Sequence, residues 1–278
     1  QVATVLPRYA AWFDSFPDIA SLAATDSDAV LKAWEGLGYY RRARFIHAAA
    51  QQIAAHHAGV FPRDFDAMHA LPGIGRSTAG AISSFCFGTS TPVLDGNVKR
   101  VLSRWHAIPE AKDKNLWKLA QTAIDASDEP DTWNQAMMEL GATLCAPTRP
   151  RCELCPLREY CDSAFRVKPA REKKTAILVQ DVHWQVHLHM DAEKGIWLMQ
   201  RPVTGIWAGL WTPPISELSE APNQSPSHVH LLTHRRLHLY AEVSDSAPHG
   251  NGQWVADINQ LALPTGIHRM LAKHGGKL

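Results

Sequence analysis

Four cysteines lie close together in the sequence, in a C-x6-C-x2-C-x5-C run formed by Cys145, Cys152, Cys155 and Cys161. The segments between them are short and polar and contain proline, which is not the pattern of cysteines that fill a hydrophobic core. Such spacing lets one segment surround a single metal centre, so the candidates are a 4Fe-4S cluster, a tetrahedral zinc ion or two disulfides. Zinc sites usually combine two C-x2-C pairs, and this run contains one. The unequal gaps therefore favour a 4Fe-4S cluster.

A glycine-rich segment at residues 71–80, Leu-Pro-Gly-Ile-Gly-Arg-Ser-Thr-Ala-Gly, is a second candidate for chemistry. Gly73 and Gly75 flank one aliphatic residue, which predicts a tight hairpin just before the next helix. Backbone N–H groups at the start of that helix point outward and can hold a phosphate without a charged side chain. Arg76 adds a local positive charge. We therefore predict a phosphate contact here, with an ordinary turn between helices as the alternative.

Three polar side chains, Asp95, Asn97 and Lys99, crowd together beside a glycine some twenty residues further on. Asp95 is a good candidate for the N-cap of the helix that is expected to begin near Asn97, because aspartate often has this role. A cap does not require the other two side chains. A carboxylate in such a cluster can also stabilise an oxocarbenium-like cation or activate a water, as in the cleavage of glycosides.

The composition describes a globular protein without the features of a membrane protein. The chain has 278 residues, enough for two domains, of which 45% are apolar and 20% charged. Its net charge of +1 does not by itself indicate a polyanionic partner. It has no long apolar run and no visible secretion signal, and a thiolate-ligated cluster fits a reducing compartment, so we expect a cytoplasmic protein. The fifth cysteine, Cys86, lies in an apolar run and is predicted to be a core residue.

The spacing of apolar residues predicts two domains of different class. Residues 1–165 are expected to form an α-helical domain, with helices at residues 27–37, 42–57, 65–71, 77–87, 97–105, 115–127 and 132–144. Residues 166–175 are basic and lack periodicity, which indicates a linker. Residues 176–278 are expected to form a smaller α+β domain, with strands at 176–179, 184–189, 196–200 and 228–244 and a closing helix at 261–273.

Several of these motifs together resemble the helix-hairpin-helix DNA glycosylases that carry an iron–sulfur cluster. Residues 71–80, residues 94–99 and the four cysteines support the resemblance to this superfamily. The closer match is to the adenine DNA glycosylases of the MutY kind, whose signatures resemble residues 36–44, 75–80, 94–100 and 134–141. The resemblance also implies that residues 176–278 form the Nudix-like domain of that family.

The resemblance implies removal of adenine mispaired with 8-oxoguanine or guanine in double-stranded DNA, by base flipping and hydrolysis of the glycosidic bond. Asp95 matches the aspartate that stabilises the cationic sugar, and Asn97 the asparagine that holds the aspartate and the sugar. Ser77 lies near the active site in relatives, and Lys99 close to the abasic product. Tyr39 matches the aromatic wedge inserted into the base stack. We expect a monomer in the bacterial cytoplasm, associated with the nucleoid.

In the second domain, the resemblance makes Thr233 and His234 candidates for reading 8-oxoguanine. Arg235 and Arg236 follow directly and are candidates for phosphate contacts. The alternating histidines around them are expected to be the solvent face of a strand, with metal binding as the alternative. This domain has no Arg-Glu-x-x-Glu-Glu helix, so pyrophosphate hydrolysis is not expected.

The sequence also departs from the family pattern. In relatives, a catalytic glutamate precedes the segment that resembles the first residues of this chain. Without that glutamate, excision is expected to be slower by about 10²–10⁴-fold, so the polypeptide is expected to bind the mispair but to excise adenine very slowly. An incomplete sequence of an active protein is the other explanation. A non-catalytic lesion-binding protein remains an alternative. So does an endonuclease III-like glycosylase/lyase, although that class has a nucleophilic lysine where this chain has Ser77.

Overall fold

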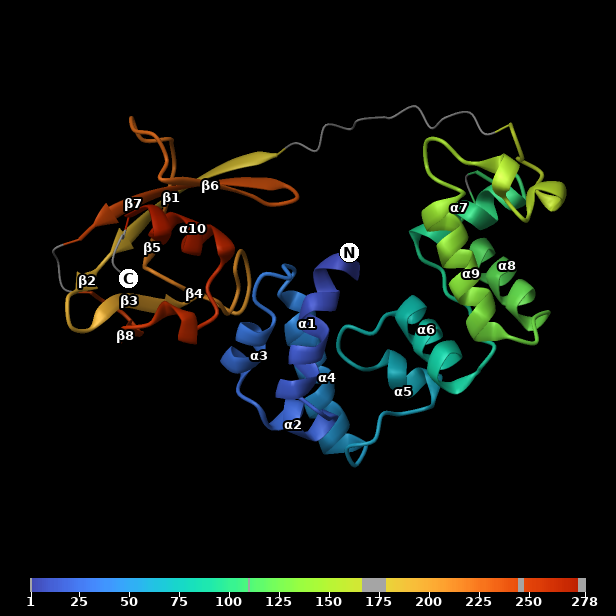
Figure 1. The fold of residues 1–278 in the computed structure, drawn as a ribbon, viewed down its shortest axis with the longest axis horizontal. Coiled ribbons are helices and arrows are strands. Elements are labelled where there is room, and N and C mark those ends of the chain that lie inside the picture. Colours follow the sequence, from blue (N-terminus) through green and yellow to red (C-terminus); the bar gives the residue numbers. More distant parts are fainter. Residues whose placement is uncertain (1, 110, 167–178, 245–247, 275–278) are drawn as a thin grey trace. The chain divides into compact units, whose positions relative to one another are not determined.

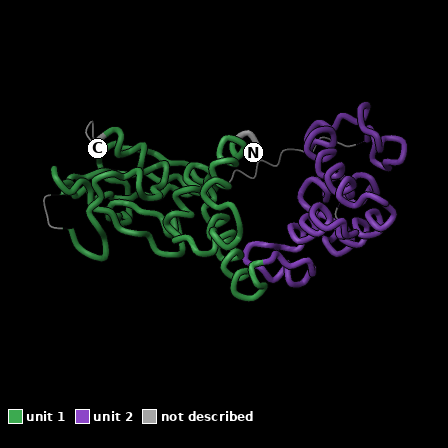
Figure 2. Tube along the Cα trace, turned by 60° about the horizontal axis from the view of Figure 1, so that its bottom comes forward, with its two compact units in different colours: residues 1–59, 175–278 green, residues 60–174 purple. Residues whose placement is uncertain are grey.

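The structure is a computed structural model that describes residues 2–109, 111–166, 179–244 and 248–274 (Figure 1). It divides into two compact units: unit 1 contains residues 1–59 and 175–278, and unit 2 contains residues 60–174 (Figure 2). This division differs from the predicted domain boundary at residue 165, because the first helices cluster with the C-terminal part of the chain. Most of the predicted strand at 176–179 and most of the predicted linker lie outside the described residues.

Unit 1 begins with four helices: α1 (Val2–Ser15), α2 (Ile19–Ala24), α3 (Ser27–Ala33) and α4 (Arg41–His56). Asp18 caps α2 by accepting a hydrogen bond from Ser21 N at 2.7 Å, and Asp26 caps α3 by accepting one from Asp28 N at 2.6 Å. The helix predicted at 27–37 ends earlier than expected, at Ala33, and a turn follows it. Helices α1 and α2 were not predicted individually.

The rest of unit 1 is an α+β domain with two small sheets (Figure 1). The first sheet has the strand order β5-β1-β7-β6, and in the second β3 pairs with β2, β4 and β8. Their bounds are β1 Gln180–Leu188, β2 Met190–Asp191, β3 Gly195–Gln200, β4 Trp211–Thr212, β5 Ile215–Leu218, β6 His228–Leu231, β7 Arg235–Val243 and β8 Gly252–Val255. The domain closes with a short 3-10 helix, η3 (Ile258–Gln260), and α10 (Thr265–His274).

The strand predicted at residues 228–244 is two antiparallel strands, β6 and β7, joined by a turn at residues 232–234. Leu232 N donates to Arg235 O at 2.8 Å and closes this turn. The alternation of apolar and polar residues is interrupted at residues 232–236, Leu-Thr-His-Arg-Arg, so the sequence did contain a sign of this break. The candidate residues Thr233 and His234 therefore lie at the exposed end of a hairpin.

The α+β domain has its own core. Strands β1 and β7 run parallel, and each turns alternate apolar side chains inward, as the period of two requires. The core residues on these strands and on α10 are Val182, Trp184, Val186, Leu188, Leu237, Leu239, Ile267, Met270 and Leu271. The same alternation places the polar residues of both strands on the other face of the sheet.

A second core joins the N-terminal helices to this domain. Leu210 and Ala262 pack in one cluster with buried residues of the first helices, namely Phe16, Leu22, Val30, Leu31, Ala43 and Ala50. The Asp28 carboxylate of α3 adds polar contacts, since it accepts hydrogen bonds from Gln200 Nε2 at 2.6 Å and from Trp211 Nε1 at 2.9 Å. Unit 1 therefore depends on contacts between segments that are far apart in the sequence.

Unit 2 is helical, which confirms the predicted class of this region. It contains α5 (Phe65–His69), α6 (Arg76–Phe87), α7 (Gly96–Trp105), α8 (Asp113–Asp125) and α9 (Pro130–Thr143), followed by the 3-10 helices η1 (Cys152–Leu154) and η2 (Arg158–Tyr160). Helices α7, α8 and α9 share a core. The prediction that Cys86 is a core residue was wrong, because the buried face of α6 is formed by small residues one turn earlier and Cys86 is exposed. None of the described helices is long and apolar enough to cross a bilayer.

The shared core of unit 1 yields a first prediction. Leu210 is 0% exposed, so Leu210→Ala should reduce the free energy of unfolding by about 2–5 kcal/mol. It should also speed amide hydrogen exchange in α2, α3 and α4, because these helices lose a packing partner. The control is Leu198→Ala, which removes an equally buried side chain from the core of the α+β domain alone. Equal acceleration of exchange in these helices by both variants would contradict the shared core.

Candidate functional site

Asp95 is the N-cap of α7. Its Oδ1 accepts hydrogen bonds from Asn97 N at 2.9 Å and from Val98 N at 2.8 Å, while Asn97 Nδ2 donates to Oδ2 at 3.1 Å. The capping interpretation is therefore correct, and of the predicted cluster Asn97 contacts the Asp95 carboxylate, whereas Lys99 bonds Asp113. Both carboxylate oxygens are held, which fixes the direction of the carboxylate at the start of the helix.

The segment before Asp95 is extended and is held by one buried amide. Asn134 of α9 is 2% exposed, and its Oδ1 accepts a hydrogen bond from Val93 N at 2.9 Å. Its Nδ2 donates to Thr91 O at 2.9 Å and to Ser84 Oγ at 2.8 Å. One side chain thus satisfies two backbone groups that have left the helices, as buried polar groups require. Asn134 was not predicted to be a site residue, although its polar side chain lies at a buried position of a helix.

Ser77 supports the same segment from the other side. Its Oγ accepts a hydrogen bond from Leu94 N at 3.1 Å, so α6 and α9 both hold the chain that leads to Asp95. This approach depends on a glycine, because a Cβ at Gly80 would lie 2.3 Å from Pro92 O. On α9, a Cβ at Gly141 would lie 2.6 Å from Asn97 Cβ. Gly80 and Gly141 thus let the chain's own backbone approach these two helices.

The predicted hairpin is present at the start of α6. Gly73 has a φ of +79°, and Gly75 is the N-cap of α6 in an extended conformation without a side-chain cap. The first N–H groups of α6 therefore receive no side-chain acceptor from their cap, and an anion is a suitable partner. The Arg76 guanidinium lies over the Trp117 ring, 4.0 Å from its centroid, which fixes it beside the hairpin.

Lys99 lies one turn after Asp95 on α7. Its Nζ forms an ion pair with Asp113 Oδ2 at 2.6 Å, and both side chains are exposed. An exposed pair of this kind is weak and does not prevent Lys99 from contacting another anion. The role of Lys99 near a reaction product stays a prediction.

Two arginines of α7 connect the Asp95 cluster to the cysteine segment. Arg100 Nη2 donates to Asn97 Oδ1 at 2.8 Å and to Gly141 O at 2.7 Å, and its Nε donates to Cys145 O at 2.8 Å. One turn later, Arg104 Nη1 donates to Ala146 O at 2.8 Å and lies 3.3 Å from Cys145 Sγ. These arginines were not predicted to be site residues. Their spacing of four on one helix places them on one face, which is the sequence signal that identifies them.

The four cysteines of the run line one small hollow of about 30 Å³, together with Arg104 and Arg158. All four are free thiols, so the alternative in which they form two disulfides is not what the structure shows. Burial raises the pKa of the Cys161 thiol, and the negative charges of the other three cysteines raise it further. Within the described ranges, no three His, Cys, Asp or Glu side chains converge in a way that would hold a single metal ion.

Tyr39 lies in unit 1, in the loop between α3 and α4. Its side chain is 74% exposed, and its φ of +48° is unusual for a residue other than glycine. Such a conformation costs roughly 1–3 kcal/mol and persists only where neighbouring contacts impose it. Here Trp34 Nε1 donates to Gly38 O at 3.0 Å, and the Arg42 guanidinium lies 5.6 Å from the centre of the Tyr39 ring. The loop therefore presents an aromatic ring to solvent in a fixed, strained conformation.

A groove of about 1010 Å³ in unit 1 brings two predicted residues together. One side is formed by residues 36–41, including Tyr39, and another by residues 231–233, including Thr233. Residues 203–205 also line the groove, and Arg44 Nη1 donates to Val203 O at 2.6 Å. Thr233 and Tyr39 were predicted from separate motifs, and the fold of unit 1 places both on one surface. His234 is exposed next to Thr233 and does not line the groove.

Comparisons with known proteins match the N-terminal and the C-terminal part of the sequence to two different families. Residues 1–126 match the model of the HhH-GPD superfamily of base excision DNA repair proteins, and residues 185–273 match that of the NUDIX domain. An adenine DNA glycosylase of Buchnera aphidicola is 37% identical over 218 residues, which are 76% of this chain and 61% of that protein. The human adenine DNA glycosylase is 43% identical over 174 residues, 60% of this chain and 32% of the human protein.

Solved structures show the same fold for the helical part. A thermostable thymine-DNA glycosylase matches with a TM-score of 0.56 and 25% identity, over 59% of this chain and 78% of that one. An endonuclease III–DNA complex matches with a TM-score of 0.52 and 24% identity, over 60% of this chain and 78% of that one. The chain spans less than two thirds of the length of the curated relatives it matches.

The contacts of Asn134 yield a second prediction. In Asn134→Leu, the buried Val93 N–H, Thr91 carbonyl and Ser84 hydroxyl all lose a partner, and each such group costs about 1–3 kcal/mol. Chemical denaturation should therefore show a large loss of stability in unit 2. Gln121→Ala is the control. It removes an exposed amide that donates to Ser90 O at 2.8 Å, in the same segment between α6 and α7. A loss no larger than that of the control would contradict the role of Asn134.

Proposed function

We propose that this chain removes adenine mispaired with 8-oxoguanine or guanine in double-stranded DNA, because residues 1–126 match the HhH-GPD superfamily of base excision DNA repair proteins and the chain is similar to adenine DNA glycosylases. The observation that supports this most is the Asp95 carboxylate, which the backbone of α7 and the amide of Asn97 hold in one direction at the start of a helix. We further propose that the protein acts as a monomer at the nucleoid, in the cytoplasm.

In the proposed reaction, the adenine is turned out of the duplex and the bond between its ring nitrogen and C1′ of the sugar breaks. The bonding electrons leave with the base, which takes up a proton, and the sugar becomes an oxocarbenium-like cation. Asp95 stabilises this cation by its negative charge, as carboxylates do in glycoside cleavage. Water then adds to C1′ and loses its proton, which leaves an abasic site. Asn97 has the role of positioning Asp95, in agreement with its bond to Oδ2.

Three surfaces are proposed to hold the DNA. The uncapped start of α6 at Gly73 and Gly75 takes a backbone phosphate, and Arg76 and Lys99 add positive charge on unit 2. In unit 1, Tyr39 is proposed to enter the base stack beside the mispair, because its ring is exposed and its backbone is fixed. Thr233 and His234, in the turn between β6 and β7, are proposed to read 8-oxoguanine. This turn borders the groove that Tyr39 also lines.

The four cysteines are proposed to hold a 4Fe-4S cluster. Four thiols on one short segment are the ligand set of such a cluster, and they face a common hollow. The cluster would supply structure and not the chemistry of base removal. Arg100 and Arg104 would then tie its loop to α7, which begins at Asp95. A zinc ion is the alternative, and a measurement of the bound metal decides between zinc and the cluster.

Two other functions stay open to test. An endonuclease III-like glycosylase/lyase needs an amine nucleophile, whereas Ser77 here bonds Leu94 N and supports the chain before Asp95. A non-catalytic protein that binds the mispair would use the same DNA surfaces but would release no base. Both alternatives give results different from those of an adenine glycosylase in the experiment on Asp95.

The proposed role of Asp95 yields a third prediction. Asp95→Asn preserves the N-cap, because asparagine caps helices as well as aspartate does, but it removes the negative charge. We expect single-turnover adenine release from an 8-oxoguanine:adenine duplex to fall by about 10²–10⁴-fold, with binding nearly unchanged. The release is measured for this chain and for a fusion that adds a glutamate-bearing N-terminal helix from a relative.

The outcomes separate the candidate functions. Release by either protein that depends on Asp95 supports the proposed glycosylase. Tight, selective binding without release in both proteins supports the non-catalytic binder instead. Release that is insensitive to Asp95→Asn, or a covalent enzyme–DNA adduct trapped by borohydride as the main product, would contradict the proposed mechanism.

The cysteine run yields a fourth prediction. Protein prepared without oxygen should contain about four iron atoms per chain and show the visible absorbance of a 4Fe-4S cluster. Cys155→Ser should lose the iron and the absorbance, because one ligand is missing. Cys86→Ser is the matched control, since Cys86 is an exposed cysteine outside the run, and it should keep both. Stoichiometric zinc without iron would contradict the proposed cluster.

A further inference from the structure

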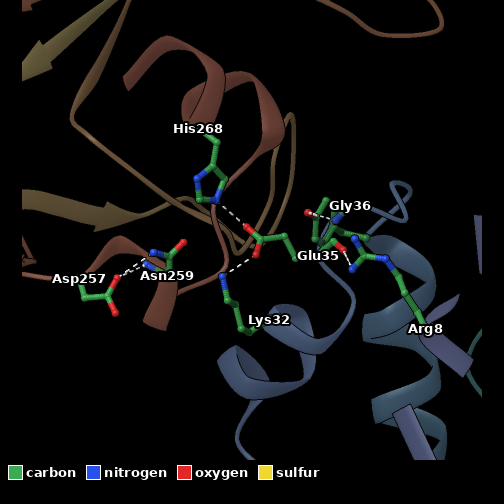
Figure 3. Close-up of polar contacts among 8 residues, drawn as sticks. Arg8, Lys32, Glu35, Gly36, Asp257, Asn259 and His268 are labelled. Atoms are coloured by element: carbon green, nitrogen blue, oxygen red, sulfur yellow. Dashed lines mark hydrogen bonds and ion pairs between the residues drawn. The ribbon is translucent and has the colours of Figure 1, made fainter. Parts of the chain in front are cut away.

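Glu35 connects the start of the Tyr39 loop, residues 36–40, to the C-terminal helix of unit 1. Figure 3 shows its carboxylate between two basic side chains that come from different elements. His268 Nε2 of α10 lies 2.7 Å from Oε1, and Lys32 Nζ donates to Oε2 at 2.5 Å. Glu35 and His268 are 233 positions apart in the sequence, so this contact exists only when the N-terminal helices and the α+β domain are packed together.

The carboxylate is well placed to control the loop, because the loop begins at the next residue. The backbone carbonyl of Glu35 accepts a hydrogen bond from Arg8, and the N–H of Gly36 donates to Tyr40 Oη at 3.4 Å. A Cβ at Gly36 would lie 2.6 Å from the Arg8 guanidinium, so Arg8 lies directly against this turn. Movement of Glu35 would therefore be transmitted to Gly36 and along the loop to Tyr39.

The surroundings of Glu35 keep it charged. Its side chain is 21% exposed, and burial acts to raise its pKa. The hydrogen bonds and charges of His268 and Lys32 outweigh burial and hold the pKa of Glu35 below its usual range. Arg8 and Tyr40 are the other ionisable groups beside it. A partly buried carboxylate with two basic partners is a stronger contact than an exposed ion pair, which is the usual kind on a protein surface.

We propose that the Glu35–His268 pair is a positioning contact for lesion recognition, which holds the Tyr39 loop against the domain that carries the 231–233 loop. The two loops border one groove, so a fixed distance between them lets Tyr39 and Thr233 meet a mispair as one preformed surface. The inference rests on the proposed function for the meaning of that surface. It does not depend on the chemistry at Asp95, because all the residues concerned belong to unit 1.

Two measurements on the full chain test this inference. The first is amide hydrogen exchange of residues 36–40 in the protein without DNA, which reports the order of the loop. The second is the ratio of affinities for an 8-oxoguanine:adenine duplex and for an undamaged duplex of the same length. In Glu35→Ala and His268→Ala, we expect exchange to become about tenfold faster and the affinity ratio to fall about 3- to 10-fold, because the loop must then be ordered on binding.

The matched control is a histidine–carboxylate pair in the same domain that does not border the groove. His238 Nε2 lies 2.8 Å from Asp181 Oδ1 on strands β7 and β1. His238→Ala should leave both measurements unchanged. Glu35→Gln keeps one of the two acceptor oxygens, so it can retain a bond to His268 or to Lys32 but not to both, and it should restore part of the affinity ratio. The double variant Glu35→Ala/His268→Ala should be no worse than Glu35→Ala alone, because the contact with His268 is already lost in that single variant.

The outcomes also separate this inference from the proposed function. If the wild-type protein does not prefer the mispair, the proposed function fails, and the exchange measurement alone decides whether the pair orders the loop. If the wild-type protein prefers the mispair but neither exchange nor the affinity ratio changes in the Glu35 and His268 variants, the inference is overturned. Equal changes in His238→Ala would also overturn it, because the effect would then be general destabilisation.

Discussion

The structure of the candidate active site depends on a short extended segment, residues 91–95, that passes between two helices. Backbone groups outside helices and sheets need other partners when they are buried, and here side chains supply them. Asn134 bonds the segment at Thr91 and Val93, and Ser77 bonds it at Leu94. These hydrogen bonds fix the path by which the segment enters α7, and they place Asp95 at the N-cap of that helix. The orientation of the carboxylate is thus set by packing before any substrate is present.

Helix α7 extends this order to the cysteine segment. Asn97, Arg100 and Arg104 lie at intervals of three and four residues, so they follow one face of the helix. Arg100 bonds Gly141 O in the last turn of α9, where carbonyl groups have no partner within the helix, and also Cys145 O just beyond it. An arginine suits this position because its planar group donates several hydrogen bonds in fixed directions. The end of α9, the start of the cysteine run and the Asp95 cluster are therefore braced by one side chain.

The local part of this arrangement was predictable from the sequence, and the long-range part was not. Apolar periodicity located the helices of unit 2 to within a few residues, and the residue type and position of Asp95 indicated a cap. Asn134 was missed because one polar residue on an apolar helix face does not reveal its partners. Leu210 and Glu35 were missed for the same reason, since their partners lie far away in the sequence. Cys86 was misjudged because an apolar run does not show which face of a helix packs when that face consists of small residues.

The Tyr39 loop shows how the two kinds of information combine. Tyr39 has a positive φ that is costly for a residue other than glycine, so neighbouring contacts must offset the cost. Trp34, at the end of α3, bonds the loop directly. Arg8 and His268 act through Glu35, the residue just before the loop. The contact with His268 exists only when α10 packs against the N-terminal helices, which in turn depends on the core around Leu210. The exposed aromatic ring and the docking of the two parts of unit 1 are therefore not independent properties. A change that loosens the shared core should therefore release the strain at Tyr39.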